Sequence, residues 1–293
     1  MSFFKRLFGS ANPKQASTTP NSPLTEVEVM PGLILPQAFA EHWTEIKRTE
    51  RECIAISAKT SENLTFADSK LGHYPCIPKG FTYPLDQHGH YMYPLAQINC
   101  SELPAQSMLP STGFLQFYIG THNDVYGMSF EDDIPSDFKV LYFSADEVAE
   151  YETNLTFLDE VLTANNSPVF EPHKLSFQLK NEFLGRSDYE GRLTTKFDWA
   201  DIIQQYPAHE EELEQCAFDT FNGSGHKLGG YAYFTQTDPR EYKPSVSAYR
   251  LLFQLDSDKQ IMWGDAGVGN FFIHPDDLAK RDFSKVFYTW DCC

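Results

Sequence analysis

The residue types best suited to ligand recognition gather between positions 250 and 270 of the 293-residue chain. Gln254 and Asp256 are two residues apart in an alternating apolar stretch, so they share one face of an expected strand. Trp263 and Asp265 have the same spacing on the expected return strand of a β-hairpin. Strand pairing then brings the indole near an amide and a carboxylate, which is a platform for a polar ligand or a peptide. The candidate binding residues are Lys227, Gln254, Asp256, Trp263, Asp265 and Asn270.

Two other interpretations of this hairpin stay open. In an architectural interpretation, Trp263 belongs to the core and Asp265 accepts backbone N–H groups in the turn at residues 264–267. In an enzymatic interpretation, His226, Asp256 or Asp265 acts as an acid or base. The sequence shows no complete nucleophile–base set, so we assign no catalytic residue.

Metal and cofactor motifs do not occur at the required spacings. The GxxxxGK[ST] phosphate loop is missing, and Asp265 would repel a phosphate. Asp256 and Asp258 do not follow the EF-hand pattern. His88 and His90 place two imidazoles on one face of a strand, but the sequence identifies no third ligand for zinc. We therefore predict no cofactor and no metal.

Composition limits the classes of partner. The formal net charge is −18, which argues against nucleic acid, because binding its backbone needs clustered Lys and Arg. No apolar run approaches the roughly 18 residues of a membrane span. The six cysteines include no CxxC pair, so neither a zinc ribbon nor a redox pair is indicated. Since no signal peptide is recognisable, we expect a cytoplasmic location.

The N-terminal segment differs in character from the rest of the chain. Apolar residues at positions 3, 4, 7 and 8 have helical spacing, with Lys5 and Arg6 on the other side. Residues 1–9 could therefore make weak membrane contact. Residues 10–23 are rich in Ser, Thr, Pro and Asn, which is typical of a flexible linker. A disordered basic and apolar tail over residues 1–23 is the alternative.

Acidic residues gather in two runs. Residues 131–160 contain ten acids and one base, Lys139, and residues 210–214 form the second run. A solvated helix or loop face is one interpretation of such runs. A surface for a basic partner is the other, and it leads us to expect a basic protein or peptide partner.

An internal repeat is the strongest long-range pattern. The motif KLGxY occurs twice, at an offset of 157 positions (70 to 227). Two further matches follow in the same order, which indicates a duplicated unit. The matched segments are residues 70–74 with 227–231, 95–99 with 252–256, and 113–119 with 267–273.

These patterns predict an α+β fold that is β-rich, with internally duplicated, pseudo-twofold antiparallel sheet units and peripheral helices. We expect one domain over residues 24–293, with repeat one at about 53–143, repeat two at about 224–293, and a helical, acidic insertion at about 144–223. The expected strands are residues 53–58, 93–99, 113–119, 138–143, 175–179, 231–235, 249–255, 261–263, 270–273 and 285–290. The expected helices are residues 36–50, 198–206, 208–218 and 275–280.

Motifs in both halves match a family pattern. They are KLG at residues 70–72, LAQIN at 95–99, GFLQF at 113–117, HKLGGY at 226–231, LLFQLDSD at 251–258, MWGDAG at 262–267 and DFS at 282–284. Together they resemble the YwqG-like family of bacterial proteins. The resemblance implies a duplicated α+β fold but no activity, because the family is catalogued as a domain of unknown function. It also implies an immunity-type or adaptor role, so we expect a non-catalytic binding or protein-interaction module.

Overall fold

The computed structural model describes residues 22–105, 108–129, 136–164 and 166–293. The membrane contact predicted for residues 1–9 lies outside the described residues, as does the predicted tail up to position 21. Residues 131–135 of the first acidic run also lie outside them. In the described ranges, every helix is too short or too polar to cross a lipid bilayer.

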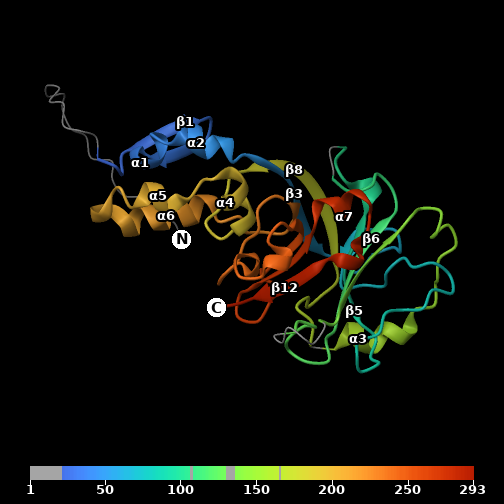
Figure 1. Cartoon of the computed structure of the whole chain (residues 1–293). Coiled ribbons are helices and arrows are strands. Elements are labelled where there is room, and N and C mark those ends of the chain that lie inside the picture. The colour runs from blue at the N-terminus through green and yellow to red at the C-terminus, as the bar shows by residue number, and fades with distance from the viewer. Residues whose placement is uncertain (1–21, 106–107, 130–135, 165) are drawn as a thin grey trace, which may run out of the picture.

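Ten antiparallel strands form one strongly curved sheet (Figure 1). The sheet curls until it nearly closes. The rings of Phe117 and Phe253 lie 4.6 Å apart, and those of Phe138 and Tyr288 lie 5.4 Å apart. Apolar side chains from both halves therefore share one core. From edge to edge the strands are β12 (Phe287–Asp291), β11 (Val268–Ile273), β10 (Arg250–Asp256), β9 (Lys227–Gly229), β3 (Arg51–Thr60), β8 (His173–Glu182), β4 (Lys70–Leu71), β5 (Tyr93–Asn99), β6 (Phe114–Ile119) and β7 (Phe138–Phe143).

The strand order is the same on both sides of the central pair β3 and β8. Strands β4 to β7 follow outward on one side, and β9 to β12 follow on the other. Gln97 on β5 pairs with Lys70, and Gln254 on β10 pairs with Lys227. Both β5 and β10 carry one register shift against the next strand outward. The matched sequence motifs thus occupy matched places in the sheet.

The segment predicted as an insertion, residues 144–223, contributes to the sheet itself. Its strand β8 pairs with β3 along ten residues and also pairs with β4, so it stands in the middle of the sheet. The strand expected at residues 175–179 is thus longer than its sequence pattern indicated. The same segment holds α3 (Asp159–Thr163), α4 (Tyr189–Thr195), α5 (Trp199–Ile203) and α6 (Glu210–Phe221).

A second hydrophobic core lies beside the sheet, in the part of Figure 1 that holds α1 (Gln37–Ala40), α2 (Trp43–Arg48), α5 and α6. Trp199 stacks on Phe221 at 4.6 Å and donates Nε1–H to the Leu184 carbonyl at 2.8 Å. Leu213, Ala217 and Phe221 recur every four residues, so one stripe of α6 faces this core. The N-terminal elements are β1 (Glu26–Met30), β2 (Leu33–Pro36), α1 (Gln37–Ala40) and α2 (Trp43–Arg48).

The strand predicted at residues 231–235 is wrong, because this stretch forms no strand. Side-chain amides occupy the backbone groups that a strand ladder would use. The N–H of Tyr233 donates to Gln254, and its carbonyl accepts from Asn270. Backbone groups satisfied in this way hold the segment against the sheet without adding a strand.

The predicted hairpin also has a different second strand. Residues 261–263 make only an isolated bridge, between Ile261 and Val169, and β10 pairs with β11 instead. The helix predicted over residues 36–50 is divided into α1 and α2. The helix predicted at 275–280 is α7 (Pro275–Ala279). The β-rich antiparallel sheet with a few helices confirms the predicted fold class at this level.

Candidate functional site

Gln254, the centre of the predicted binding hairpin, is fully buried on β10. Its Oε1 accepts the N–H of Tyr233 at 2.8 Å. Its Nε2 donates to the carbonyls of Gly223 at 3.0 Å and Gly225 at 2.8 Å. Asn270, its cross-strand neighbour on β11, donates Nδ2 to the Tyr233 carbonyl at 2.8 Å. The two amides therefore clamp two loop segments to the face of the sheet opposite the shared core.

The first set of strands carries the same amide arrangement. Gln97 accepts the N–H of Cys76 at 2.7 Å and donates to the carbonyls of Phe66 at 2.8 Å and Asp68 at 2.9 Å. Gln116 donates to the Cys76 carbonyl at 2.6 Å. Each loop partner lies 157 positions before its counterpart in the second set (66 to 223, 68 to 225, 76 to 233). Side-chain amides at corresponding strand positions thus bind backbone groups at corresponding loop positions in both sets.

Asp256 and His226 also bind backbone groups. Asp256 Oδ2 accepts the N–H of Gly225 at 2.6 Å, and the N–H of Asp256 donates to His226 Nδ1 at 3.0 Å. The other ring nitrogen, Nε2, lies 3.3 Å from Asp258 Oδ2. Burial alone would raise the pKa of Asp258, but hydrogen bonds from Gln260 N–H and the imidazole hold it below its ordinary value. Both ends of the His226 ring are therefore engaged within this turn.

Lys227 forms a buried ion pair. Its ammonium lies 2.8 Å and 3.0 Å from the two carboxylate oxygens of Glu182, which also accepts the N–H of Tyr231. The corresponding Lys70 instead donates to backbone carbonyls, including that of Thr65 at 2.6 Å. Burial lowers the pKa of Lys70 to about 8. A buried charge needs a partner, and Lys227 finds its partner inside the fold.

Trp263 and Asp265 separate in the structure. Trp263 is fully buried and packs edge-on against Tyr126, with ring centroids 5.6 Å apart. A side chain at Gly269 would collide with the Trp263 ring, which explains the glycine there. Asp265 is exposed in the following turn. The indole therefore serves the core, and the Asp265 carboxylate faces solvent.

The structure brings four of the six predicted residues onto one face of the sheet. Lys227, Gln254 and Asn270 form one register row across β9, β10 and β11, and Asp256 follows two residues along β10. The hydrogen bonds described above commit these four side chains to loops and to an ion pair. These side chains hold residues 223–225 and 231–233 against the sheet.

A groove of about 900 Å³ lies elsewhere, between the N-terminal hairpin and α6. We call it the α6 groove. One face of α6, which carries Leu213, Ala217 and Phe221, packs against the second core. The neighbouring face carries Glu212, Cys216 and Asp219 at helical spacing, and this face lines the groove. Its lining residues are Leu24, Glu26, Ile34, Leu35, Pro36, Glu211, Glu212, Gln215, Cys216, Asp219 and Thr220.

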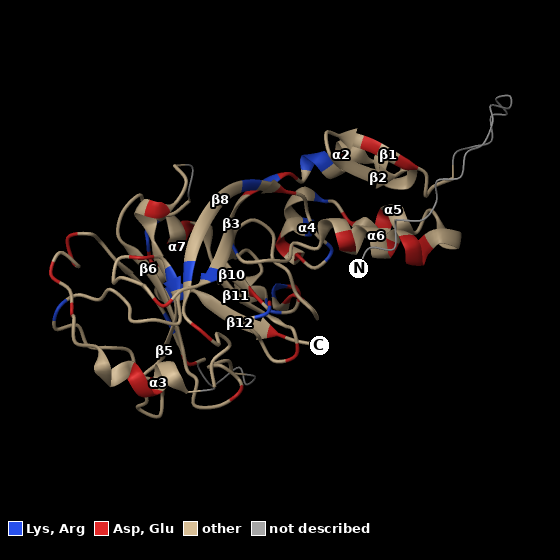
Figure 2. Ribbon diagram, turned by 180° about the vertical axis from the view of Figure 1, so that it is seen from behind, with Lys and Arg blue, Asp and Glu red and all other residues tan. Residues whose placement is uncertain are grey.

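The α6 groove is lined by apolar residues, which we call its floor, and by acidic residues, which we call its rim. Ile34, which lines the groove, is 56% exposed. Burial raises the pKa of the Cys216 thiol, so this group stays neutral and adds to the apolar surface. Four of the described lining residues are Asp or Glu, and none is Lys or Arg. Figure 2 shows the acidic residues along α6.

Sequence reasoning found the acids of α6 but missed the groove. The signal for its other wall is the alternating segment EVEVM at residues 26–30, followed by a Pro-Gly turn and LILP at residues 33–36. An alternating segment and a short apolar segment on either side of a Pro-Gly turn are typical of a β-hairpin. Gly32 has φ +82°, the left-handed conformation that this turn requires.

A family model described as "Domain of unknown function (DUF1963)" matches residues 69–292. The match covers most of the chain, so the chain belongs to this family, in agreement with the expected catalogued domain of unknown function. No curated protein matches the chain. The matched residues begin after the hairpin of β1 and β2, so one wall of the α6 groove lies outside them.

Proposed function

We propose that this member of the DUF1963 family is a non-catalytic binding module, which holds a basic, amphipathic peptide segment of a protein partner in the α6 groove. The observation that carries the proposal is the apolar floor rimmed by four carboxylates. A peptide with Leu or Phe side chains on the floor and Lys or Arg at the rim satisfies both parts of the groove.

The two parts of the groove have different roles in binding. Covering the exposed surface of Ile34 and Leu24 contributes roughly 1–2 kcal/mol of hydrophobic free energy. The carboxylates at the rim mainly accelerate association and select a basic partner, because exposed charges add little affinity on their own. Specificity for positive charge should therefore weaken as salt is added.

The enzymatic alternative has less support. It assigns acid or base roles to His226, Asp256 and Asp265. Backbone and side-chain hydrogen bonds engage both nitrogens of His226 and both oxygens of Asp256. Asp265 is exposed in a turn, away from the fully buried Trp263 that was expected beside it.

Fluorescence anisotropy with a labelled peptide tests the proposal. The probe is a synthetic Phe-Lys-Arg-Leu-Phe-Lys peptide, and its counterpart replaces each basic residue with Glu. Only the basic peptide should bind the protein saturably. The double variant Glu211→Lys/Glu212→Lys should weaken binding about tenfold, because two rim attractions become repulsions. Ile34→Asp should also weaken peptide binding, because it removes an apolar contact of the floor and leaves the charges of the rim unchanged.

A charge-matched control separates the groove from the overall negative charge. Asp146→Lys/Glu150→Lys changes the net charge by the same amount at exposed positions outside the groove. Equal losses in the two double variants would show that the peptide only follows the net charge, and the proposed site would be wrong. Lys5→Glu/Arg6→Glu is a further control, because tighter peptide binding in it would identify the N-terminal segment as a competitor for the groove.

Finer features of the protein belong to the same proposal. We infer that the two strand sets are copies of one unit, supported by their matched order, registers and amide hydrogen bonds. The motifs of the second half support placing the chain among YwqG-like proteins of bacteria. A cytoplasmic adaptor or immunity-type role, with a basic protein partner, is consistent with the acidic groove.

A further inference from the structure

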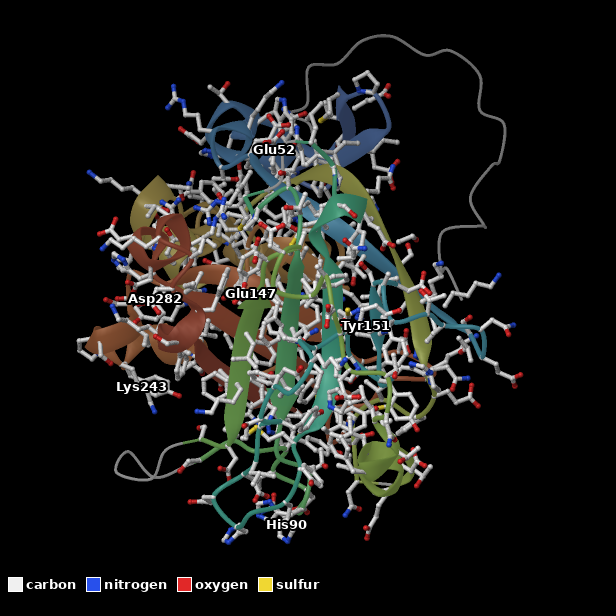
Figure 3. The ribbon with its side chains drawn as sticks, turned by 90° about the vertical axis from the view of Figure 1, so that its right-hand side faces the viewer. Glu52, His90, Glu147, Tyr151, Lys243 and Asp282 are labelled. Atoms are coloured by element: carbon white, nitrogen blue, oxygen red, sulfur yellow. The ribbon has the colours of Figure 1, made fainter. Side chains whose placement is uncertain are left out.

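Three histidines and an aspartate meet on two loops beside the β5–β6 strand pair. Asp86, His88 and His90 come from the loop between β4 and β5, and His122 follows β6. The ring centroids of His88 and His122 lie 4.7 Å apart, and those of His90 and His122 lie 5.8 Å apart. Figure 3 shows His90 at the far end of the molecule from Glu52, outside the strands. Folding thus brings Asp86 and His122 to His90, whereas His88 of the His-x-His motif does not belong to this three-residue group.

Asp86 is held in position by its own loop. Its side chain is only 1% exposed, and Oδ1 accepts the N–H groups of His88 and His90, both at 2.8 Å. Burial alone would raise the pKa of Asp86, but hydrogen bonds from His90 and His88 hold it below its ordinary value. The carboxylate is therefore charged and fixed at neutral pH, with Oδ2 turned towards the imidazoles.

The distances approach those of a metal centre. Asp86 Oδ2 lies 3.1 Å from His90 Nδ1 and 3.0 Å from His122 Nδ1, and the three possible ligand atoms lie within 4.8 Å of one another. With Zn–N and Zn–O bonds of about 2.0–2.1 Å, tetrahedral ligand atoms stand about 3.3 Å apart. Two edges of the triangle already have nearly this length. His90 is 63% exposed and has room to rotate and close the third edge.

The surroundings also fit a bound ion. His122 Nε2 lies 3.0 Å from Asn123 Nδ2. With the Asn123 amide turned over, its Oδ1 would accept the Nε2–H of an imidazole whose Nδ1 binds the ion. A cavity of about 380 Å³ borders His90 and His122 and is also lined by Glu160. This leaves space for a water molecule or a small ligand at a fourth coordination position.

We propose that Asp86, His90 and His122 bind one divalent transition-metal ion of the Zn²⁺ class. Two imidazoles and one carboxylate are donors that suit Zn²⁺ and Co²⁺, whereas Ca²⁺ and Mg²⁺ prefer oxygen ligands throughout. This site is separate from the α6 groove and does not depend on the proposed peptide binding.

Titration of the full-length protein with Co²⁺ tests the site, with Zn²⁺ then used to displace the Co²⁺. One equivalent of Co²⁺ should produce a visible d–d absorption band without a thiolate charge-transfer band. His90→Ala and His122→Ala should each weaken Co²⁺ binding roughly tenfold or more. Binding should also fall below neutral pH, because imidazole ligands must be unprotonated.

The matched control is His42→Ala. His42 Nδ1 lies 2.6 Å from Glu45, so it forms a histidine–carboxylate pair that belongs to no three-ligand group among the described residues. This variant should bind Co²⁺ like the wild type. No saturable binding, or equal losses in the control and the cluster variants, would overturn the proposal. A thiolate charge-transfer band would also overturn it, because it would place the ion at cysteines such as Cys292 and Cys293.

Discussion

Replacing Gln254 with Met tests whether the buried amide of β10 is architecture. Methionine has a similar length but cannot make the three hydrogen bonds to Tyr233, Gly223 and Gly225. Each bond contributes about 1 kcal/mol net, and a backbone group that loses its partner and stays covered from water costs about 1–3 kcal/mol. Part of this loss is offset by apolar burial of the methionine. We expect the free energy of unfolding to fall by about 3–5 kcal/mol.

Urea denaturation, followed by circular dichroism, measures this loss. Gln97→Met should destabilise the protein by a similar amount, because Gln97 makes the corresponding three bonds in the first strand set. Gln204→Met is the control, since this glutamine is exposed and its substitution should change the stability by less than about 0.5 kcal/mol. The slope of the unfolding free energy against urea should stay constant among the variants.

The two interpretations of Gln254 predict opposite outcomes. If Gln254 instead recognises a ligand, Gln254→Met should unfold at nearly the wild-type urea concentration and lose a bound partner. A loss of less than about 1 kcal/mol would refute the architectural reasoning. A large loss at Gln254 with none at Gln97 would contradict the equivalence of the two strand sets.

Two further predictions concern basic residues. Burial lowers the pKa of Lys70 from 10.5 to about 8, so between these values the folded protein binds fewer protons than the unfolded chain. The stability of the wild type relative to Lys70→Met should therefore rise from pH 8 to pH 10, by roughly 2 kcal/mol, and a flat difference in urea melts would contradict this. At the N-terminus, Lys5→Glu/Arg6→Glu should reduce sedimentation with phosphatidylserine vesicles at low salt, and unchanged sedimentation would exclude membrane contact through residues 1–9.

The sequence predicted best those elements whose pattern is local. Residues 93–99 and 138–143 alternate or carry β-branched and aromatic residues, and both are strands with the predicted bounds. The segment at 231–235 has the same aromatic composition but forms no strand. Its backbone partners are the side chains of Gln254 and Asn270, which are distant in sequence. Composition alone does not show whether the backbone of a segment will pair with a neighbouring strand or with side chains.

The candidate functional sites depend on contacts between residues that are distant in sequence, and no local sequence pattern predicts these contacts. The alternation of Gln254 and Asp256 correctly placed them on one face, but did not indicate that loops cover this face. His122 is separated from His90 by all of β5 and β6, so only the fold completes the ligand set. The α6 groove likewise needs both β2 and a helix far along the chain.

The loops after β4 and β9 show where the two strand sets differ in their charged side chains. The amide framework positions both loops in the same way. In the second loop, Arg240 is fully buried between Asp188 and Asp238, at 2.9 Å and 2.6 Å, and its charges are matched within the fold. In the first loop, the charge of Asp86 faces imidazoles, of which His90 is largely exposed. An ion can reach the Asp86 carboxylate of the first loop beside the exposed His90, but the buried Arg240 pairing of the second loop is closed to it. The proposed metal site therefore has no counterpart at Arg240.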